Sequence, residues 1–201
     1  MDVRPLIKAN TLLNENEVAI LRKRKSWINI LAIALMWFQV FAAMALFIFF
    51  PGVITFLLAA LIIASKQFQM VIFMHDGAHG LISKNRKLND FVSQWFCAYP
   101  VLTDTYPYRN THLQHHKYTE SEKDPDLGLT IAFPTTKWSL MRKVIRDITG
   151  IAGLRRYKNI FVSVWGQDLT FKNHIKRFFK KTKGFFITNL LILGVLIIAG
   201  N

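Results

Sequence analysis

The feature of the sequence that most constrains the fold is a run of 40 residues, Ser26 to Ser65, that contains no Lys, Arg, Asp or Glu. A helix needs roughly 20 apolar residues to cross a lipid bilayer, so this run is long enough for two crossings. Pro51 and Gly52 divide the run, since proline cannot continue a helix and glycine tolerates the turn. We therefore expect a helical hairpin that crosses the membrane at residues 27–50 and 53–74.

A second uncharged block, Gly184 to Ala199, predicts a third membrane helix at residues 184–200. The chain stops directly after it, so we expect this third and last helix to be truncated. Across the whole chain 52% of the residues are hydrophobic and 19% are charged, which is too apolar a balance for an ordinary soluble domain. The sequence thus predicts an all-α integral membrane protein with a single, incomplete domain at residues 1–201.

The basic residues lie beside the apolar runs and not inside them. The formal net charge of +14 would suggest nucleic-acid binding in a soluble protein. Here, however, Arg22 to Lys25 precede the first crossing and Lys180 to Lys183 precede the third. This pattern keeps flanking segments in the cytosol beside anionic lipid. We therefore expect no nucleic-acid partner and a multi-pass protein with a cytosolic N-terminus.

The apolar segment at residues 91–102 is too short to cross the membrane. As a helix its 12 residues would extend about 18 Å, against a hydrocarbon core of about 30 Å. We expect it to lie along the membrane interface. Residues 103–183 mix aromatic and basic side chains and are predicted to form cytosolic helices. Motifs on the two sides of the short segment therefore share the cytosolic side.

Five of the six histidines fall in two motifs that flank this segment, HxxxH at His75 and His79 and HxxHH at His112, His115 and His116. Residues three or four apart share a helix face, and the small residues between the first two histidines leave room for a second element. Either motif alone is common without a metal. Together, beside hydrocarbon, so many imidazoles would be costly unless a metal binds them. Imidazole binds Fe, Zn, Cu and Ni alike, so the motifs predict a metal centre without naming the metal.

Over roughly residues 27–127 the chain resembles the membrane fatty acid desaturase family. The resemblance rests on the segments His75-Asp-Gly-Ala-His79-Gly80, Lys84-Asn-Arg-Lys87, Leu88-Asn89-Asp90, Tyr108-Arg109-Asn-Thr-His112-Leu-Gln-His115-His116 and Asp124-Pro-Asp126. It implies two non-haem irons at the cytosolic end of a four-helix membrane bundle, which use dioxygen and two electrons to remove hydrogens from an acyl chain or lipid. The ligands it implies are His75, His79, His112, His115 and His116.

Other residues near the motifs have candidate roles in orienting the ligands. Asp76 could accept an imidazole N–H, or be an ordinary helix-end carboxylate. Asp124 and Asp126 could orient ligands or pair with Arg109, or form a solvated turn. No haem or flavin motif is present, so the electrons would come from a separate protein, a ferredoxin or a b-type cytochrome.

The sequence departs from the family in one large respect, because no third motif of the HxxHH or QxxHH type is present. His174 stands alone, matches no motif and is expected to be a surface or interfacial residue. Two irons with five or six positions each need more ligands than five imidazoles supply. We therefore expect this chain alone to hold iron weakly or incompletely and not to turn over.

Three alternatives to a desaturase exist, and the sequence argues against the first of them. The HDGAH segment differs from the HExxH motif of zinc proteases by an Asp, which is too short for the general base, and that mechanism has no use for HxxHH. A hydroxylase or carotenoid ketolase on the same scaffold is a closer competitor, and a non-catalytic desaturase-like scaffold is the third. Cys97 is the only cysteine, so we expect no disulfide and a small buried side chain at this position.

Overall fold

The computed structural model describes residues 12–21, 23–166 and 170–199, and every regular element in those ranges is helical. The predicted all-α fold is therefore confirmed. Three helices, those that contain α2, α3 and α9, are long and apolar enough to cross a membrane. The elements are α1 (Glu15–Leu21), α2 (Ser26–Phe49), α3 (Val53–Ala78), α4 (Arg86–Val92), the π-helix η2 (Ser93–Ala98), the 3₁₀-helix η3 (Tyr99–Val101), α5 (Thr105–Tyr118), α6 (Leu127–Thr130), α7 (Lys137–Ile148), α8 (Ile151–Trp165) and α9 (Phe171–Ala199).

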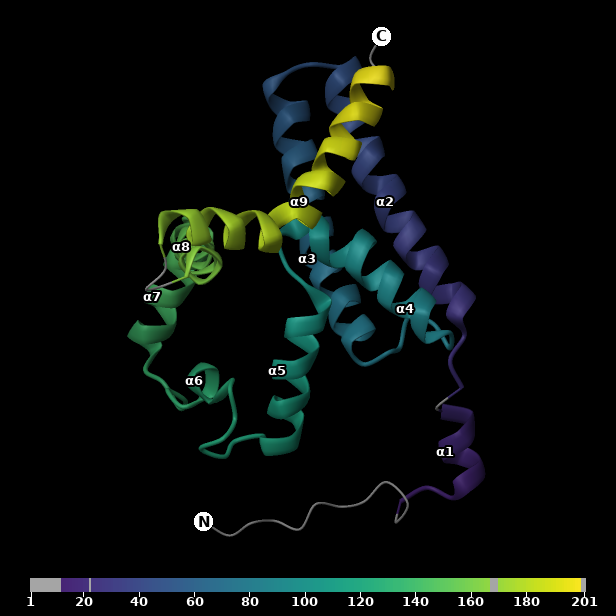
Figure 1. The fold of residues 1–201 in the computed structure, drawn as a ribbon, viewed down its shortest axis with the longest axis vertical. Coiled ribbons are helices and arrows are strands. Elements are labelled where there is room, and N and C mark those ends of the chain that lie inside the picture. Colours follow the sequence, from purple (N-terminus) through teal and green to yellow (C-terminus); the bar gives the residue numbers. More distant parts are fainter. Residues whose placement is uncertain (1–11, 22, 167–169, 200–201) are drawn as a thin grey trace.

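The predicted hairpin is formed by α2 and α3, which lie side by side (Figure 1). The turn between them contains Pro51 and Gly52, and Thr55 donates its hydroxyl to the Phe50 carbonyl at 2.6 Å. Large apolar side chains such as Phe38 and Leu61 stay exposed along the hairpin, as expected for a surface in contact with lipid. Helix α3 extends to Ala78, so the HxxxH motif begins inside a helix that is long and apolar enough to cross a membrane. Arg22, in the predicted basic flank, lies outside the described residues.

The segment at residues 91–102 forms the end of α4 together with η2 and η3, and it packs across the end of α3. Its inward face is buried and includes Ser93 and Cys97, whereas Phe91 and Phe96 on the other face are exposed. Cys97 has no exposed surface, which confirms the predicted small buried side chain. A segment with one buried and one exposed apolar face suits a position at the membrane interface, and this position stays a prediction. The main apolar cluster joins this segment to α2 and α3, with Met36, Met74 and Ala98 at its centre.

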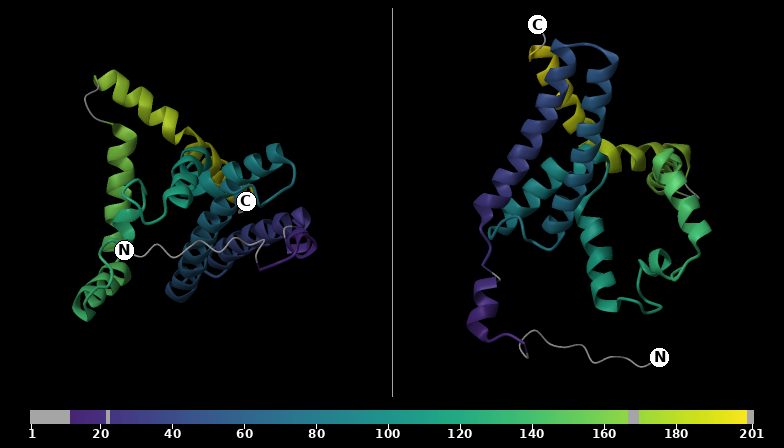
Figure 2. Two further views of the ribbon diagram at one scale, coloured as in Figure 1. Left: turned by 90° about the horizontal axis from the view of Figure 1, so that it is seen from below. Right: turned by 180° about the vertical axis from the view of Figure 1, so that it is seen from behind.

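The third long helix, α9, begins at Phe171, well before the uncharged block at residue 184. Its first half lies beside α8, and it then changes direction to run along the hairpin (Figure 1). Helices α7 and α8 stand apart from the hairpin in both further views (Figure 2). The chain therefore leaves α5, passes around one side of the molecule and returns through α9. Gly200, at the end of the predicted third crossing, lies outside the described residues.

Candidate metal centre

Four histidines converge where the C-terminal end of α3 packs against α5. Their ligand atoms all lie within 4.8 Å of one another, and the four are His75, His79, His112 and His116. The Nε2 atom of His112 is 2.9 Å from that of His79 and 3.0 Å from that of His116. The two sequence motifs, more than 30 residues apart in the chain, thus meet at one point.

Local structure explains how each helix presents its histidines. His75 and His79 are one turn apart at the end of α3, with ring centroids separated by 4.8 Å. Helix α5 begins at Thr105, where the Asp104 side chain accepts the Tyr106 N–H at 3.0 Å as an N-terminal cap. This start places the HxxHH histidines in the final turns of α5.

The surroundings of His79 and His112 favour neutral imidazoles, the form that binds a metal. Burial, followed by the charges of the neighbouring histidines, lowers the pKa of His112 to about 4. Burial and the neighbouring His75 and His116 also lower the pKa of His79. Nitrogens that share one ion at about 2.1 Å lie roughly 3–4 Å apart, close to the spacing of this cluster. The donor set therefore fits a metal ion.

His115 lies beside this cluster and not within it. Its ring centroid is 5.6 Å from that of His116 and 6.0 Å from that of His112. Its Nδ1 atom lies 2.8 Å from Asp124 Oδ1, and this hydrogen bond raises the pKa of His115. A carboxylate on Nδ1 leaves Nε2 free, as in many metal-binding histidines. His115 thus stays a predicted ligand, and its orientation is set by Asp124.

Asp124 is held from several sides, with only 2% of its side chain exposed. It accepts the N–H groups of Glu120 at 2.9 Å and Asp126 at 2.8 Å in addition to its bond with His115. Asp126 itself is 3.9 Å from His115, and Asp76 is 3.4 Å from His75 Nδ1, longer than a good hydrogen bond. Of the predicted carboxylates, Asp124 is therefore the one with a firm contact to a histidine.

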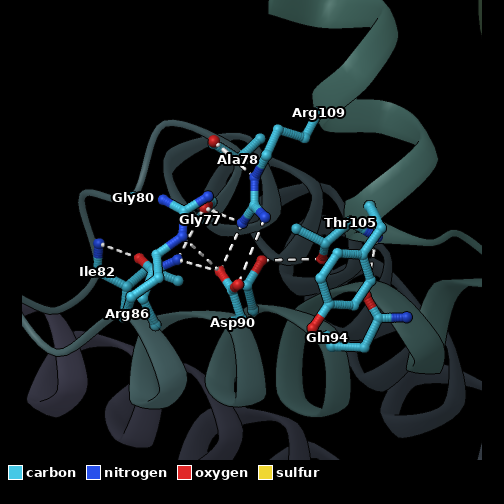
Figure 3. Close-up of polar contacts among 12 residues, drawn as sticks. Gly77, Ala78, Gly80, Ile82, Arg86, Asp90, Gln94, Thr105 and Arg109 are labelled. Carbon is cyan, nitrogen blue, oxygen red and sulfur yellow. Dashed lines mark hydrogen bonds and ion pairs between the residues drawn. The ribbon is translucent and has the colours of Figure 1, made fainter.

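The suggested pairing of Arg109 with Asp124 or Asp126 is wrong, because Arg109 pairs with Asp90 at 2.6 Å. The reason is its place on the face of α5 that meets α3, whereas Asp124 and Asp126 follow the far end of α5. Figure 3 shows the Arg109 side chain reaching from its helix to the end of α3 and to Asp90.

The Arg109 guanidinium binds the backbone between His75 and His79. Its Nε donates to the Ala78 carbonyl at 2.9 Å and its Nη2 to the Gly77 carbonyl at 3.0 Å. The last carbonyls of a helix have no partner within the helix, so these bonds satisfy groups at the end of α3. One side chain of α5 thereby fixes the position of both histidine motifs.

A second set of contacts, from α4 and η2, closes the same region. Asn89, which is fully buried, donates to the Gly77 carbonyl at 2.9 Å and accepts the Ile82 N–H at 3.1 Å. Gly77 has no space for a side chain, because a Cβ there would overlap Ser93. The Ser93 hydroxyl in turn lies 2.9 Å from that of Thr105 at the start of α5. The predicted close approach at Gly77 is thus confirmed.

Asn89 and Asp90 belong to one of the segments that carry the family resemblance, but the sequence alone predicts no role for them. The available signal was two polar residues directly before an apolar segment, which indicates buried side chains with specific partners. His174 is remote from the cluster, as expected, since it stacks on Trp165 with centroids 5.0 Å apart and bonds to its carbonyl at 2.8 Å.

Comparison with known proteins defines the class to which this fold and site belong. The profile of the fatty acid desaturase family matches residues 51–201, about three quarters of the chain, and the chain belongs to this family. The chain is also similar to dihydrorhizobitoxine desaturase of Bradyrhizobium elkanii, with 38% identity over 77 residues. That match covers 37% of this chain and 22% of the relative, so the chain matches about a fifth of that protein's length. No solved structure matches the chain.

Proposed function

We propose that the chain forms part of an oxygen-dependent desaturase that acts on an acyl chain at a non-haem di-iron centre. The observation that carries the proposal is the convergence of four histidines from α3, its C-terminus and α5 within 4.8 Å. Membership of the fatty acid desaturase family supports it independently. Imidazole alone does not select iron, so the choice of metal rests on the family.

The reaction removes one hydrogen from each of two adjacent methylene groups and leaves a carbon–carbon double bond. Two electrons and two protons come from the substrate, two of each come from a donor and the solvent, and one dioxygen becomes two waters. The bound irons supply the oxidising power, which no side chain has. In this proposal His75, His79, His112 and His116 hold the metal, and Asp124 orients His115 as a further ligand.

The surrounding protein would supply position and orientation in the membrane. Arg109 keeps the two histidine motifs in register through Gly77, Ala78 and Asp90. We place the N-terminus and the histidines on the cytosolic side, because basic residues flank the apolar helices. A separate ferredoxin or b-type cytochrome would deliver the electrons there, and the acyl substrate would enter from the membrane.

Because five imidazoles are too few to fill two iron sites, the direct test is product analysis in cells that express the whole gene. We expect acyl chains with a new double bond, detected by gas chromatography and mass spectrometry, and their loss in His112→Ala and His116→Ala. The His174→Ala variant is the matched control, since His174 lies outside the cluster. An alcohol or ketone product would contradict desaturation. Wild-type product levels in both cluster variants would contradict the assigned site.

A further inference from the structure

A cavity of about 840 Å³ lies between α5 and the first half of α9. His112, one of the four converging histidines, forms part of its wall, together with Tyr108 and Thr111 of α5. The cavity is within the size range of small-molecule sites in proteins. The cavity therefore borders the candidate metal centre at His112.

The opposite wall of this cavity carries three lysines of α9, Lys176, Lys180 and Lys181. None of them forms an ion pair with any residue that the structure describes. Lys176 and Lys180 are one helical turn apart and so share a face of α9. Three ammonium groups that form no ion pair with a described carboxylate favour an anionic ligand at this wall.

The cavity wall also carries two carboxylates on the side of α5, Asp104 and Asp126, and neither forms an ion pair with the lysines. Asp104 accepts the Tyr106 N–H at 3.0 Å as the cap of α5. A fourth basic residue, Arg177, donates to the carbonyls of Val164 and Ser163, both at 3.1 Å. Arg177 thus anchors α9 to the end of α8, whereas the three lysines are left for a ligand.

The positive charge continues into a neighbouring groove between α7 and α8, which Lys181 also borders. This groove is lined by four further basic residues and by a single carboxylate, Asp147. Asp147 is already paired with Lys143 at 2.7 Å. The basic residues of the groove are Lys143, Arg146, Arg155 and Arg156.

We propose that Lys176, Lys180 and Lys181 bind the phosphate of the head group of the acyl substrate, while its chain extends past His112 to the metal centre. The inference rests on the proposed function and adds the chemical class of the head group. A phosphate offers several charged acceptor oxygens to three amines, whereas an uncharged ester head offers no charge to them. A soluble phosphate-bearing thioester and a phospholipid share this chemistry.

The test measures binding to the metal-free full chain in dodecyl maltoside micelles, with no turnover required. The probes are stearoyl-coenzyme A, a stearoyl phosphatidic acid and methyl stearate, which has an uncharged head. We expect at least one phosphate-bearing probe to bind roughly tenfold or more tightly than methyl stearate, about the contribution of one charge-assisted hydrogen bond. Which of the two binds identifies the source of the phosphate.

Variants of the lysines make the test specific. The triple variant Lys176→Gln, Lys180→Gln, Lys181→Gln should lose the preference for phosphate, and the triple Lys→Arg variant should keep it. The matched control changes Lys158, Lys172 and Lys183 to Gln, because these residues line neither the cavity nor the neighbouring groove. The proposal would be overturned if methyl stearate bound as tightly as both phosphate-bearing probes. It would also be overturned if the triple Gln variant and its control bound the phosphate-bearing probes equally tightly. A desaturase that lacks this head-group preference would still produce alkene, so the two proposals fail separately.

Discussion

Among single residues, Arg109 makes the contacts that hold the two histidine helices in register. We expect Arg109→Lys to lower the free energy of unfolding by roughly 1–3 kcal/mol, because one ammonium cannot replace a planar fork and leaves buried oxygens without a donor. Chemical denaturation in micelles measures the change. The control is Arg86→Lys, because the exposed Arg86 side chain contacts the same Asp90 carboxylate at 3.4 Å. An equal loss in both variants would contradict the special position of Arg109.

The partner of Arg109 should make stability depend on pH. Burial alone would raise the pKa of Asp90, but hydrogen bonds from Arg109 and Asn89 and the charges of Arg109 and Arg86 lower it below its usual 3.8. A carboxyl with a lowered folded-state pKa stabilises fully above its ordinary pKa and loses this contribution as the pH falls through the folded value. We therefore expect the stability difference between wild type and Asp90→Asn to shrink below about pH 4. A difference that stays constant from pH 6 to pH 3 would exclude this role.

Asp124 acts on the metal centre through His115. We expect Asp124→Asn to weaken metal binding roughly 10–100-fold, the usual effect of removing the carboxylate behind a metal-binding histidine. Titration with Co²⁺, followed by its visible absorption, measures the affinity without turnover. Asp126→Asn is the control, since Asp126 is 3.9 Å from His115 against 2.8 Å for Asp124. Equal affinities of the two variants would show that Asp124 does not orient the ligand.

At the scale of elements, the packing of η2 against α3 depends on Gly77. We expect Gly77→Ala to cost roughly 1–3 kcal/mol of folding free energy, the typical effect of overpacking. The added Cβ would overlap Ser93, so the second change Ser93→Gly should recover part of the loss. Thermal unfolding of the single and double variants measures both effects. If Gly77→Ala costs as much stability in the Ser93→Gly background as in the wild type, steric overlap is not the cause.

The main elements follow from the sequence because their signals are local. The uncharged run predicts α2 and α3, and the histidine spacing predicts helices at both motifs. The early start of α9 and the π-helical form of η2 have no comparable signal, since mixed basic and aromatic residues suit several structures. The contact of Arg109 with Asp90 depends on how α5 crosses α3. The same crossing explains why four histidines converge while His115 turns to Asp124.

At the scale of the whole molecule, the arrangement of the apolar helices predicts which parts of the chain face the cytosol and which face the outside of the cell. The turn at Gly52 joins α2 and α3 at the end of the hairpin opposite the histidines, and Thr119 directly follows α5. With the histidines in the cytosol, a Gly52→Cys variant should react with an impermeant maleimide on intact cells. A Thr119→Cys variant should react only after the membrane is permeabilised. The reverse pattern would invert the proposed orientation.

Because Cys97 is buried in η2, the reactivity of its thiol reports how often η2 separates from its neighbours. Burial, followed by the charge of Asp76, raises the pKa of this thiol to about 12, so it carries almost no thiolate at neutral pH. Introduced cysteines can therefore be labelled without removing the native one. Where η2 separates transiently from α3, Cys97 becomes accessible, and its slow modification by a small reagent gives the free energy of that separation. The rate of Cys97 labelling thus measures how tightly η2 is packed against the end of α3 that carries the histidines.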